Sequence, residues 1–473
     1  MESFDLLIVG GGINGAAIAR DAALREKKVL LVERDDLAQH TSSASSKLVH
    51  GGLRYLEYYE FRLVREALRE RETLLRTAPH IVRPLRFLLP QAQGGRRWWM
   101  VRAALLLYDL FAARGSLPRS RSAGRSEGNG LKPGHRLLSY WDASVDDARL
   151  VVLNAVDAAE HGAAIATRTE FLSARRHGEM WRAELSGGRT VEARTIVNAA
   201  GPWVADVLRQ RLRETSKSRV RLIRGSHIAV PRLDQAEDAY ILLQPDGRVV
   251  FAIPYGELTL IGTTDVPVDT PEEATISEEE IRYLCEAVDR YFVRQVVPAD
   301  VVWSYSGLRS LYDDGAAEAK AVSRDYHLEL DQDPGPKLLS VYGGKITTAR
   351  ALAQEALDLL EIDGRRRTAF EALPGGDLMP AFNVWLAGLT WLPPPLLARL
   401  ARAYGTRLPR LLGGAARIED LGRHFGAGLY EAELRYLTAH EFARTAEDIL
   451  WRRTKLGLRM SAAEQAALTA WLS

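Results

Sequence analysis

The chain has 473 residues, 47% of them hydrophobic and 26% charged, and this length exceeds one ordinary domain, so we expect two or three. Its 63 basic and 61 acidic side chains nearly cancel, which argues against a nucleic-acid partner. The single cysteine, Cys285, excludes an internal disulfide and makes a thiolate metal site or an iron–sulfur cluster implausible, so we expect no metal.

The first elements follow the order strand, turn, helix, strand. Phe4–Val9 predicts a short buried strand, Gly10–Gly15 a turn, Ala16–Arg25 a helix and Val29–Glu33 a second strand. This order is typical of the start of a parallel, doubly wound sheet. The sequence shows no basic secretory leader and no apolar run that could span a bilayer, so we expect a cytoplasmic protein.

The predicted turn carries the spacing Gly-x-Gly-x-x-Gly. Gly10 permits a tight turn, Gly12 lets the backbone approach a pyrophosphate, and Gly15 lets the helix pack on the strand. Glu33 follows at about 20 residues' distance, where a carboxylate accepts the ribose hydroxyls and repels a 2′-phosphate. The pattern therefore predicts FAD or NAD rather than NADP. The contacts expected in this loop are Gly10, Gly12, Ile13, Asn14 and Gly15.

Further segments favour FAD over NAD, because a flavin needs a longer cradle than a nicotinamide. Thr41–Lys47 offers hydroxyls and backbone donors directly after the second strand, and Ala199–Gly201 and Gly343–Lys345 are strand ends where glycine permits close approach. The FAD contacts expected in and beside these segments are Thr41, Ser42, Ser43, Ser45, Ser46, Gly51, Gly52, Leu53, Gly201, Trp203, Gly344, Lys345, Ile346 and Thr347.

Two helices are predicted next, a charged one over Glu57–Thr77 and a strongly apolar one between residues 96 and 114. The second contains Trp98, Trp99 and Leu105–Leu107, and apolar and aromatic side chains with basic neighbours suit a peripheral membrane anchor. A helix buried in a second domain or in a dimer interface is the alternative, and both stay open. The basic neighbours are Arg96, Arg97, Arg102, Arg114, Arg119, Arg121 and Arg125.

The middle of the chain predicts strands of two kinds. Thr195–Ala200 and Leu338–Val341 are short apolar strands that end at glycines, as buried parallel strands do. Between residues 222 and 264 the hydrophobic period approaches two, which predicts an antiparallel or mixed sheet and a second domain inserted into the first. Ser277 and Glu280 form a capping box at the start of a helix.

Beyond Gly376 the sequence is rich in Ala, Leu and Arg at helical spacing, with a capping box at Ser461 and Glu464. The expected fold class is therefore α/β: a Rossmann-like FAD-binding fold, an inserted mixed-sheet substrate (cap) domain and a C-terminal all-helical domain. The expected limits are 1–85, 140–222 and 300–370 for the FAD-binding domain, 86–139 and 223–299 for the cap domain, and 374–473 for the helical domain.

The whole run from Thr41 to Glu57, TSSASSKLVHGGLRYLE, is far more specific than a glycine pattern. It resembles the FAD-dependent glycerol-3-phosphate dehydrogenases of the aerobic, respiratory kind. The resemblance extends over essentially the whole chain, through Tyr59–Val64, Trp141–Leu150, Asn198–Trp203, Arg224–Ile228, Ile261–Asp265, Tyr305–Arg309, Tyr342–Thr348, Tyr430–Leu434 and Leu450–Lys455. Two positions depart from it: Glu26 replaces the usual Gly, at a cost of about 1 kcal/mol if the turn is left-handed, and Ser310 replaces Pro.

The resemblance implies oxidation of sn-glycerol 3-phosphate to dihydroxyacetone phosphate, with hydride transfer to flavin N5 and electrons passed to a membrane quinone. It also implies a homodimer held peripherally on anionic lipid at the inner face of the cytoplasmic membrane. A glycerol-3-phosphate oxidase that uses oxygen is the nearest alternative. An amine or amino-acid oxidase on the same flavin scaffold is a more distant one, because its site has no need of two phosphate-binding arginines.

Such a site must bind a phosphate dianion, and the planar guanidinium fork matches phosphate oxygens. Arg309 and Arg54 lie in the family motifs, at predicted loop or strand ends, and are expected to bind the phosphate. Tyr55 and Thr264 are expected to donate hydrogen bonds to the substrate.

His50 and Lys345 compete for the role of proton acceptor. The ordinary pKa of histidine, near ~6.5, suits proton transfer at neutral pH. Lys345 could instead provide a positive charge near flavin N1–C2=O, which stabilises the anionic reduced flavin. We take His50 as the base and Lys345 as the electrostatic partner, and the sequence leaves their ranking open.

Overall fold

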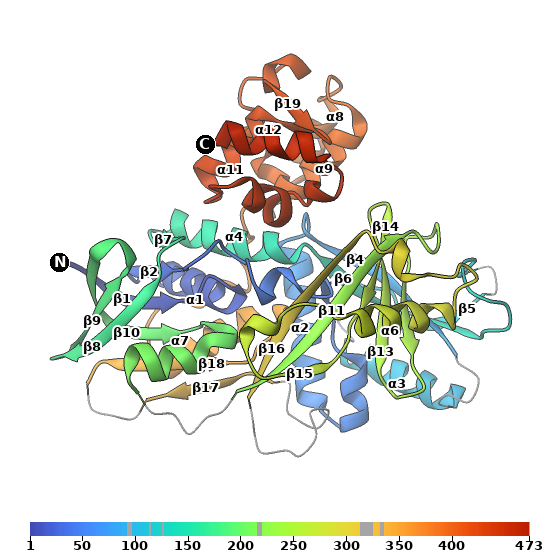
Figure 1. Cartoon of the computed structure of the whole chain (residues 1–473), viewed down its shortest axis with the longest axis horizontal. Coiled ribbons are helices and arrows are strands. Elements are labelled where there is room, and N and C mark those ends of the chain that lie inside the picture. The colour runs from blue at the N-terminus through green and yellow to red at the C-terminus, as the bar shows by residue number, and fades with distance from the viewer. Residues whose placement is uncertain are drawn as a thin grey trace.

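The computed structural model describes residues 1–91, 97–112, 115–124, 127–214, 220–312, 325–331 and 335–472, apart from the side chains of Arg54, Glu57 and Tyr58. Figure 1 shows a sheet with a parallel centre and its helices, a second large sheet beside it, and a helical domain above the first. The expected class, an α/β fold with a mixed-sheet cap and a C-terminal helical domain, is confirmed.

The first sheet has β1 at its centre, and its neighbours β10 and β2 run parallel to it. Both faces of β2 and of the C-terminal halves of β1 and β10 are covered, which explains why these segments are buried at successive positions rather than at alternate ones. In order across the sheet the strands are β17 (His327–Leu330), β18 (Lys337–Tyr342), β10 (Arg189–Asn198), β1 (Glu2–Val9), β2 (Val29–Val32) and β7 (Ala164–Ala166), and β9 (Met180–Leu185) with β8 (Phe171–His177) extends β10.

Three helices cover one face of this sheet with small and branched side chains that form a shared core. They are α1 (Ile13–Leu24), α4 (Asp147–Glu160) and α7 (Ala349–Leu359). Helix α1 begins earlier than predicted, because the second and third glycines of the loop lie at its N-terminal end rather than before it. The turn after α1 is left-handed at Glu26, with φ +61°, so the strain expected at this departure from the family pattern is present.

The second sheet is mixed, with antiparallel pairs throughout except for β12 beside β4. Its strands are β15 (Val266–Val268), β11 (Val220–Pro231), β14 (Leu258–Gly262), β13 (Val249–Tyr255), β12 (Ala239–Leu243), β4 (Val82–Pro90), β6 (Leu137–Val145) and β3 (Leu48–Val49), with β16 (Trp303–Tyr312) on β11 and β5 (Arg121–Ala123) on β6. Helix α6 (Glu278–Asp289) packs on it and begins with the expected Ser277–Glu280 capping box.

Sheet membership differs from the expected domain limits at several strands. Strands β3 and β16 fall entirely, and β4 and β6 partly, in ranges expected for the FAD-binding domain, yet they hydrogen-bond into the second sheet. The reason is long-range: β16 pairs with β11 from Val220–Tyr312 to Ala229–Trp303, and hydrophobic period alone does not encode which strand a segment pairs with. The exact limits of the domains remain a proposal.

Two further helices pack against the second sheet, α2 (Phe61–Thr77) and α3 (Trp98–Phe111). Helix α2 begins later than the predicted Glu57, because residues 53–58 form a 3₁₀ turn. Among the described parts of the chain, no helix combines the length and the hydropathy needed to cross a membrane.

The C-terminal domain has its own hydrophobic core. Figure 1 shows it stacked over α4. Its elements are α8 (Pro380–Ala387), α9 (Pro394–Tyr404), α10 (Leu408–Leu412), α11 (Glu431–His440) and α12 (Ala462–Leu472), with a short hairpin of β19 (His424–Gly426) and β20 (Leu429–Tyr430). The expected capping contacts between Ser461 and Glu464 are present, and the hairpin is a small addition to the all-helical expectation.

Candidate flavin and substrate site

A cavity of about 660 Å³ lies between the two sheets. Its floor is formed where β1, β10 and β18 end, at Gly10, Ala199–Gly201 and Gly343–Gly344. In doubly wound sheets the crevice at the carboxyl ends of parallel strands is where ligands bind. The cavity therefore unites the three glycine-containing strand ends that the sequence singled out.

The glycine loop leaves no room for side chains. Gly10 has φ +113°, and a Cβ there would lie 2.5 Å from the Ala199 carbonyl oxygen. A Cβ at Gly15 would overlap the carbonyl oxygen of Gly10. Gly12 is the N-cap of α1, so the helix N-terminus opens onto the cavity without a side chain in front of it. This geometry fits a dinucleotide pyrophosphate.

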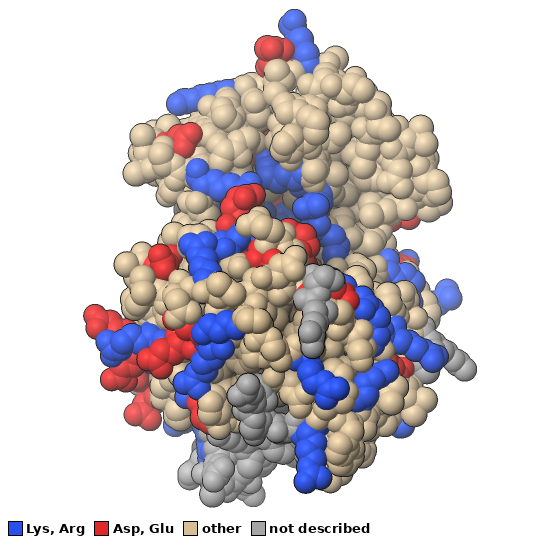
Figure 2. Space-filling model, turned by 90° about the vertical axis from the view of Figure 1, so that its right-hand side faces the viewer, with Lys and Arg blue, Asp and Glu red and all other residues tan. Residues whose placement is uncertain are grey.

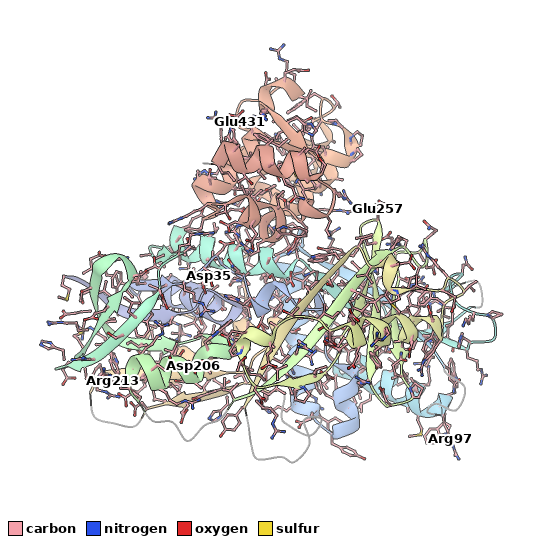
Figure 3. All side chains as sticks on the ribbon, in the orientation of Figure 1. Asp35, Arg97, Asp206, Arg213, Glu257 and Glu431 are labelled. Carbon is pink, nitrogen blue, oxygen red and sulfur yellow. The ribbon has the colours of Figure 1, made fainter. Side chains whose placement is uncertain are left out.

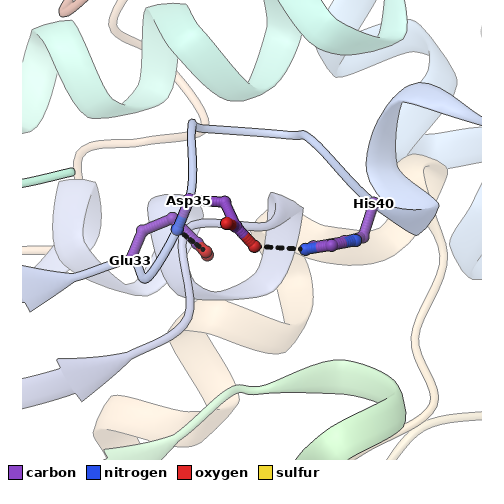
Figure 4. Close-up of side chains that lie close together, drawn as sticks. All are labelled: Glu33, Asp35 and His40. Carbon is purple, nitrogen blue, oxygen red and sulfur yellow. Dashed lines mark hydrogen bonds and ion pairs between the residues drawn. The ribbon is translucent and has the colours of Figure 1, made fainter. Parts of the chain in front are cut away.

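Glu33 directly follows β2 and is buried against the glycine loop. Its two carboxylate oxygens accept hydrogen bonds from the backbone N–H groups of Gly11 (2.6 Å) and Asp35 (2.9 Å). Burial raises the pKa of Glu33, and the two hydrogen bonds oppose that rise. Figure 4 shows Glu33 next to an Asp35–His40 pair joined at 2.9 Å. All three groups are thus already engaged with protein partners at the edge of the cavity where a ribose would lie.

Most cradle hydroxyls in Thr41–Lys47 bind protein groups. Ser42 Oγ accepts a hydrogen bond from the Ile13 N–H at 2.9 Å, and Thr41 donates to the Leu308 carbonyl. Ser45 donates to Asp147 at 2.7 Å, and Ser46 bonds the ring of His227 at 2.9 Å. These residues therefore hold the cradle in shape as well as line it.

A buried acceptor in the cavity wall also indicates a ligand. Asn14 donates through Nδ2 to the Gly343 carbonyl at 3.0 Å, while its Oδ1 is buried without a hydrogen-bond partner among the described residues. A Cβ on Gly344 would lie 2.8 Å from the Asn14 amide, so this glycine keeps the amide beside the cavity. Together with the glycine loop, this wall fits FAD.

The predicted cofactor residues divide into two groups. Those that line the cavity are Gly10, Gly12, Ile13, Asn14, Glu33, Thr41, Ser42, Ser45, Ser46, Gly201, Trp203, Gly344, Lys345, Ile346 and Thr347. Those that do not line it are Gly15, Ser43, Gly51, Gly52 and Leu53. The second group supports the wall from behind: the Gly51 N–H, for example, donates to the hydroxyl of the buried Tyr108 at 2.8 Å.

On the substrate side, Arg309 reaches the cavity from β16. Its guanidinium pairs with Asp265 and donates to Thr263 Oγ1 at 3.0 Å. Thr264 requires a correction, because its side chain is buried and donates to Glu280 at 2.6 Å, away from the cavity. The preceding residue, Thr263, lines the cavity instead, and both residues lie in the connection between β14 and β15. The side chain of Arg54 lies outside the described residues.

His50, Tyr55 and Lys345 meet at one wall of the cavity. Lys345 Nζ lies 4.3 Å from the centre of the Tyr55 ring, in a cation–π contact. His50 Nδ1 accepts a hydrogen bond from the Gly52 N–H at 3.1 Å, and the ring packs against Phe251. Burial lowers the pKa of His50, and the charge of Lys345 adds to that effect.

Two buried groups were missed by residue-level reasoning. His227 lines the cavity, stacks on Tyr305 at 4.9 Å, and burial lowers its pKa to about 3, so it is neutral at physiological pH. Lys47 pairs with the buried carboxylate of Asp147 at 2.9 Å. Both lie inside runs that carry the family resemblance, Arg224–Ile228 and Thr41–Glu57, so the signal was present there.

Comparison with known proteins covers nearly the entire chain. Residues 5–359 match the family described as FAD dependent oxidoreductase, and residues 366–471 match the C-terminal domain of alpha-glycerophosphate oxidase. A crystal structure of glycerol-3-phosphate dehydrogenase from Bacillus halodurans, complexed with FAD, superposes with a TM-score of 0.74 at 26% identity, covering 99% of this chain and 94% of that one.

Two curated relatives are similar over full length. The glycerol-3-phosphate dehydrogenase of Pseudomonas aeruginosa is 51% identical, covering 100% of this chain and 95% of the relative. The D-erythritol 1-phosphate dehydrogenase of Brucella abortus is 49% identical, covering 99% and 98%. With a glycine loop, a cradle and a cavity that fit the cofactor, the chain belongs to the FAD dependent oxidoreductases, in the group of FAD-dependent glycerol-3-phosphate dehydrogenases, and is an enzyme with FAD as its cofactor.

Proposed function

We propose that this enzyme oxidises sn-glycerol 3-phosphate to dihydroxyacetone phosphate. One observation carries the proposal: a single cavity of about 660 Å³ contains the flavin cradle together with Arg309, Lys345 and His50. A phosphate ester needs a cationic end, and its C2 hydroxyl needs a proton acceptor. The full-length relative named as a glycerol-3-phosphate dehydrogenase, at 51% identity, supports the same substrate.

Arg309 is the proposed phosphate ligand. Its pairing with Asp265 and its bond to Thr263 fix the orientation of the guanidinium fork before any substrate arrives. A fork held in one geometry loses less side-chain entropy when it binds a phosphate. Lys345, which is held over Tyr55, supplies a second positive charge in the same cavity.

His50 is the proposed proton acceptor for the C2 hydroxyl, and bound FAD would supply the hydride acceptor. The bond from the Gly52 N–H to His50 Nδ1 bears on this role, because a neutral ring that accepts at Nδ1 carries its proton on Nε2. To act as a base through Nε2, the ring must adopt the other tautomer and give up that bond. In the present tautomer, Nε2 would donate a hydrogen bond to a substrate oxygen.

The direct test is anaerobic addition of sn-glycerol 3-phosphate to the purified, FAD-loaded enzyme, followed at the flavin absorbance band. We expect rapid bleaching, and glycerol without phosphate should not bleach the flavin at the same concentration. A flavin that stays oxidised with the phosphate ester would disprove the proposed reaction.

A longer polyol phosphate is the second candidate substrate. The relative named as a D-erythritol 1-phosphate dehydrogenase is 49% identical, only two percentage points below the glycerol-3-phosphate relative. D-Erythritol 1-phosphate belongs in the same bleaching assay, where the ratio of the two kcat/KM values ranks the substrates. A ratio in favour of erythritol 1-phosphate would replace our first proposal.

For the electron acceptor, we propose a membrane quinone reached from a peripheral position on anionic lipid, as a homodimer. Helix α3 supports this: Trp99, Leu106 and Leu110 lie 63%, 52% and 66% exposed at helical spacing, while Leu105 and Tyr108 face the core. Figure 3 shows Arg97, at the start of α3, at the opposite end of the molecule from Glu431 in the C-terminal domain. Figure 2 shows several basic side chains over the lower part of the molecule, below a largely uncharged C-terminal domain.

Vesicles containing anionic lipid test the membrane proposal. We expect Trp99→Ser with Leu106→Ser to reduce co-sedimentation, whereas Val384→Ser, which removes a 75% exposed side chain in α8, should not. If the α3 double variant binds the vesicles as well as Val384→Ser does, α3 is an exposed helix that does not contact lipid. Peroxide yield under air, compared with quinone reduction, separates this acceptor from the oxygen of an oxidase.

A further inference from the structure

The C-terminal domain contacts the FAD-binding domain through buried charges. Arg453 donates from Nη1 and Nη2 to the two oxygens of Asp36 at 2.7 and 2.8 Å, and Arg452 Nε donates to the same carboxylate at 2.5 Å. These side chains are at most 4% exposed. Arg452 also pairs with Asp448, which in turn binds Arg168. The two domains thus share one ion network, in which Asp36, Arg452, Arg453 and Asp448 are shielded from water.

Asp36 lies in the loop that shapes the adenosine side of the cofactor site. It follows Glu33 by three residues, and Ala38 N–H donates to the Gly11 carbonyl at 3.1 Å. The loop then leads to Ser42, which accepts from the Ile13 N–H at the start of α1. A displacement of Asp36 would therefore move groups on both sides of the pyrophosphate position.

A second contact from the same C-terminal segment reaches the other end of the cradle. Lys455 Nζ lies 3.7 Å from Asp147, a fully buried carboxylate. Asp147 also accepts hydrogen bonds from the backbone and side chain of Ser45 and from Lys47 Nζ. Asp36 and Asp147 thus flank the cradle residues Thr41–Ser46, and each is paired with a cation from residues 452–455.

A buried carboxylate without a charged partner is strongly unfavourable, so the loop conformations that keep Asp36 paired with Arg452 and Arg453 are preferred. Those conformations are also the ones that align the cradle for FAD. Lys455 adds a second cation to Asp147, which already pairs with Lys47. We propose that Arg452, Arg453 and Lys455 are positioning residues through which the C-terminal domain sets the affinity of the enzyme for FAD. Domain docking and FAD binding then favour one another, as linkage requires of two events that stabilise the same state.

The test is FAD retention rather than turnover. In Arg453→Lys the charge stays but the paired hydrogen bonds to Asp36 cannot both form, and we expect the Kd for FAD to rise about ten-fold or more. Dilution of the holoenzyme, followed by the fluorescence of released flavin, measures this Kd. At saturating FAD, flavin reduction by sn-glycerol 3-phosphate should return toward the wild-type rate.

Glu160→Gln is the matched control, because Glu160 joins the same two domains through Arg407 but touches no cradle residue. It should leave the Kd for FAD unchanged even if it lowers the melting temperature. Lys455→Gln is a milder second variant that should raise the Kd several-fold, in case Arg453→Lys does not fold. Variants that fold and lower the melting temperature while keeping wild-type FAD affinity would overturn the proposal and make this a purely structural interface.

Discussion

The two halves of the cavity are built on different principles. The FAD half is defined by backbone: glycines that leave no room for a Cβ, a helix N-terminus, and N–H groups that fix Glu33. The substrate half is defined by side chains, namely Arg309, His50 and Lys345, which contact Thr263, Phe251 and Tyr55 from distant parts of the sequence. A substitution in the FAD half therefore disturbs the backbone of the whole loop, while a substitution in the substrate half removes one side chain and leaves the backbone in place. We therefore expect changes in the FAD half to lower FAD content, and changes in the substrate half to alter the kinetic constants with FAD still bound.

The largest effect is expected from Gly15→Ala. Its Cβ would overlap the Gly10 carbonyl oxygen, so either α1 or the loop must move, and FAD content should fall close to zero with a loss of about 2–3 kcal/mol in unfolding free energy. Flavin absorbance per protein measures the FAD content, and urea unfolding measures the free energy of unfolding. Gly247→Ala is the control: its φ is +78° but nothing lies near its Cβ, so it should cost about 1 kcal/mol and keep its FAD. Full FAD content in Gly15→Ala would contradict the backbone description.

His50→Asn should leave FAD bound and slow flavin reduction about 10²–10⁴-fold, the usual contribution of a general base. Burial lowers the pKa of His50, so the neutral ring is present at pH 7 and becomes protonated only as the pH falls below the ordinary pKa of histidine. The wild-type rate should accordingly be flat from about pH 7 upward and fall on the acid side. Single-turnover rates across pH check this. If the rate of His50→Asn still falls on the acid side, that fall is caused by the titration of another group.

Arg309→Ala should raise KM for the phosphate ester by about 100-fold, because a charge-assisted pair of hydrogen bonds is lost. The flavin spectrum should stay that of the wild type, since no cofactor contact is removed. Arg309→Lys keeps the charge but not the guanidinium fork, so its KM should lie between those of the wild type and Arg309→Ala. Steady-state kinetics decide, and an unchanged KM in Arg309→Ala would remove this residue from the phosphate site.

The smallest effect is expected at Glu26, away from both halves. Glu26→Gly relieves a left-handed residue with φ +61° on an exposed turn, and we expect a gain of at most about 1 kcal/mol in unfolding free energy. Kinetic constants should not change. A loss of stability would mean that Glu26 makes a favourable contact that outweighs its strain.

The sequence predicted the FAD half well because glycine spacing constrains backbone directly. Gly10, Gly12 and Glu33 line the cavity as expected. The sequence was a poorer guide to the directions of side chains. Thr264 donates to Glu280 while Thr263 lines the cavity, and this difference arises in the connection between β14 and β15, whose conformation no sequence period encodes. His227 was missed because its significance depends on burial beside Ser46, a residue 181 positions away.

The order of strands in the first sheet has a consequence for biosynthesis. Strand β18, at residues 337–342, pairs with β10, so the sheet that carries the glycine loop is incomplete until residue 342 has been made. Asp36 pairs with Arg452 and Arg453, which are made later still. Because chains emerge from the ribosome N-terminus first, the cofactor site closes only after residue 453 has emerged. A polypeptide truncated between residues 16 and 451 would carry every glycine of the FAD loop and still lack the contacts that close it.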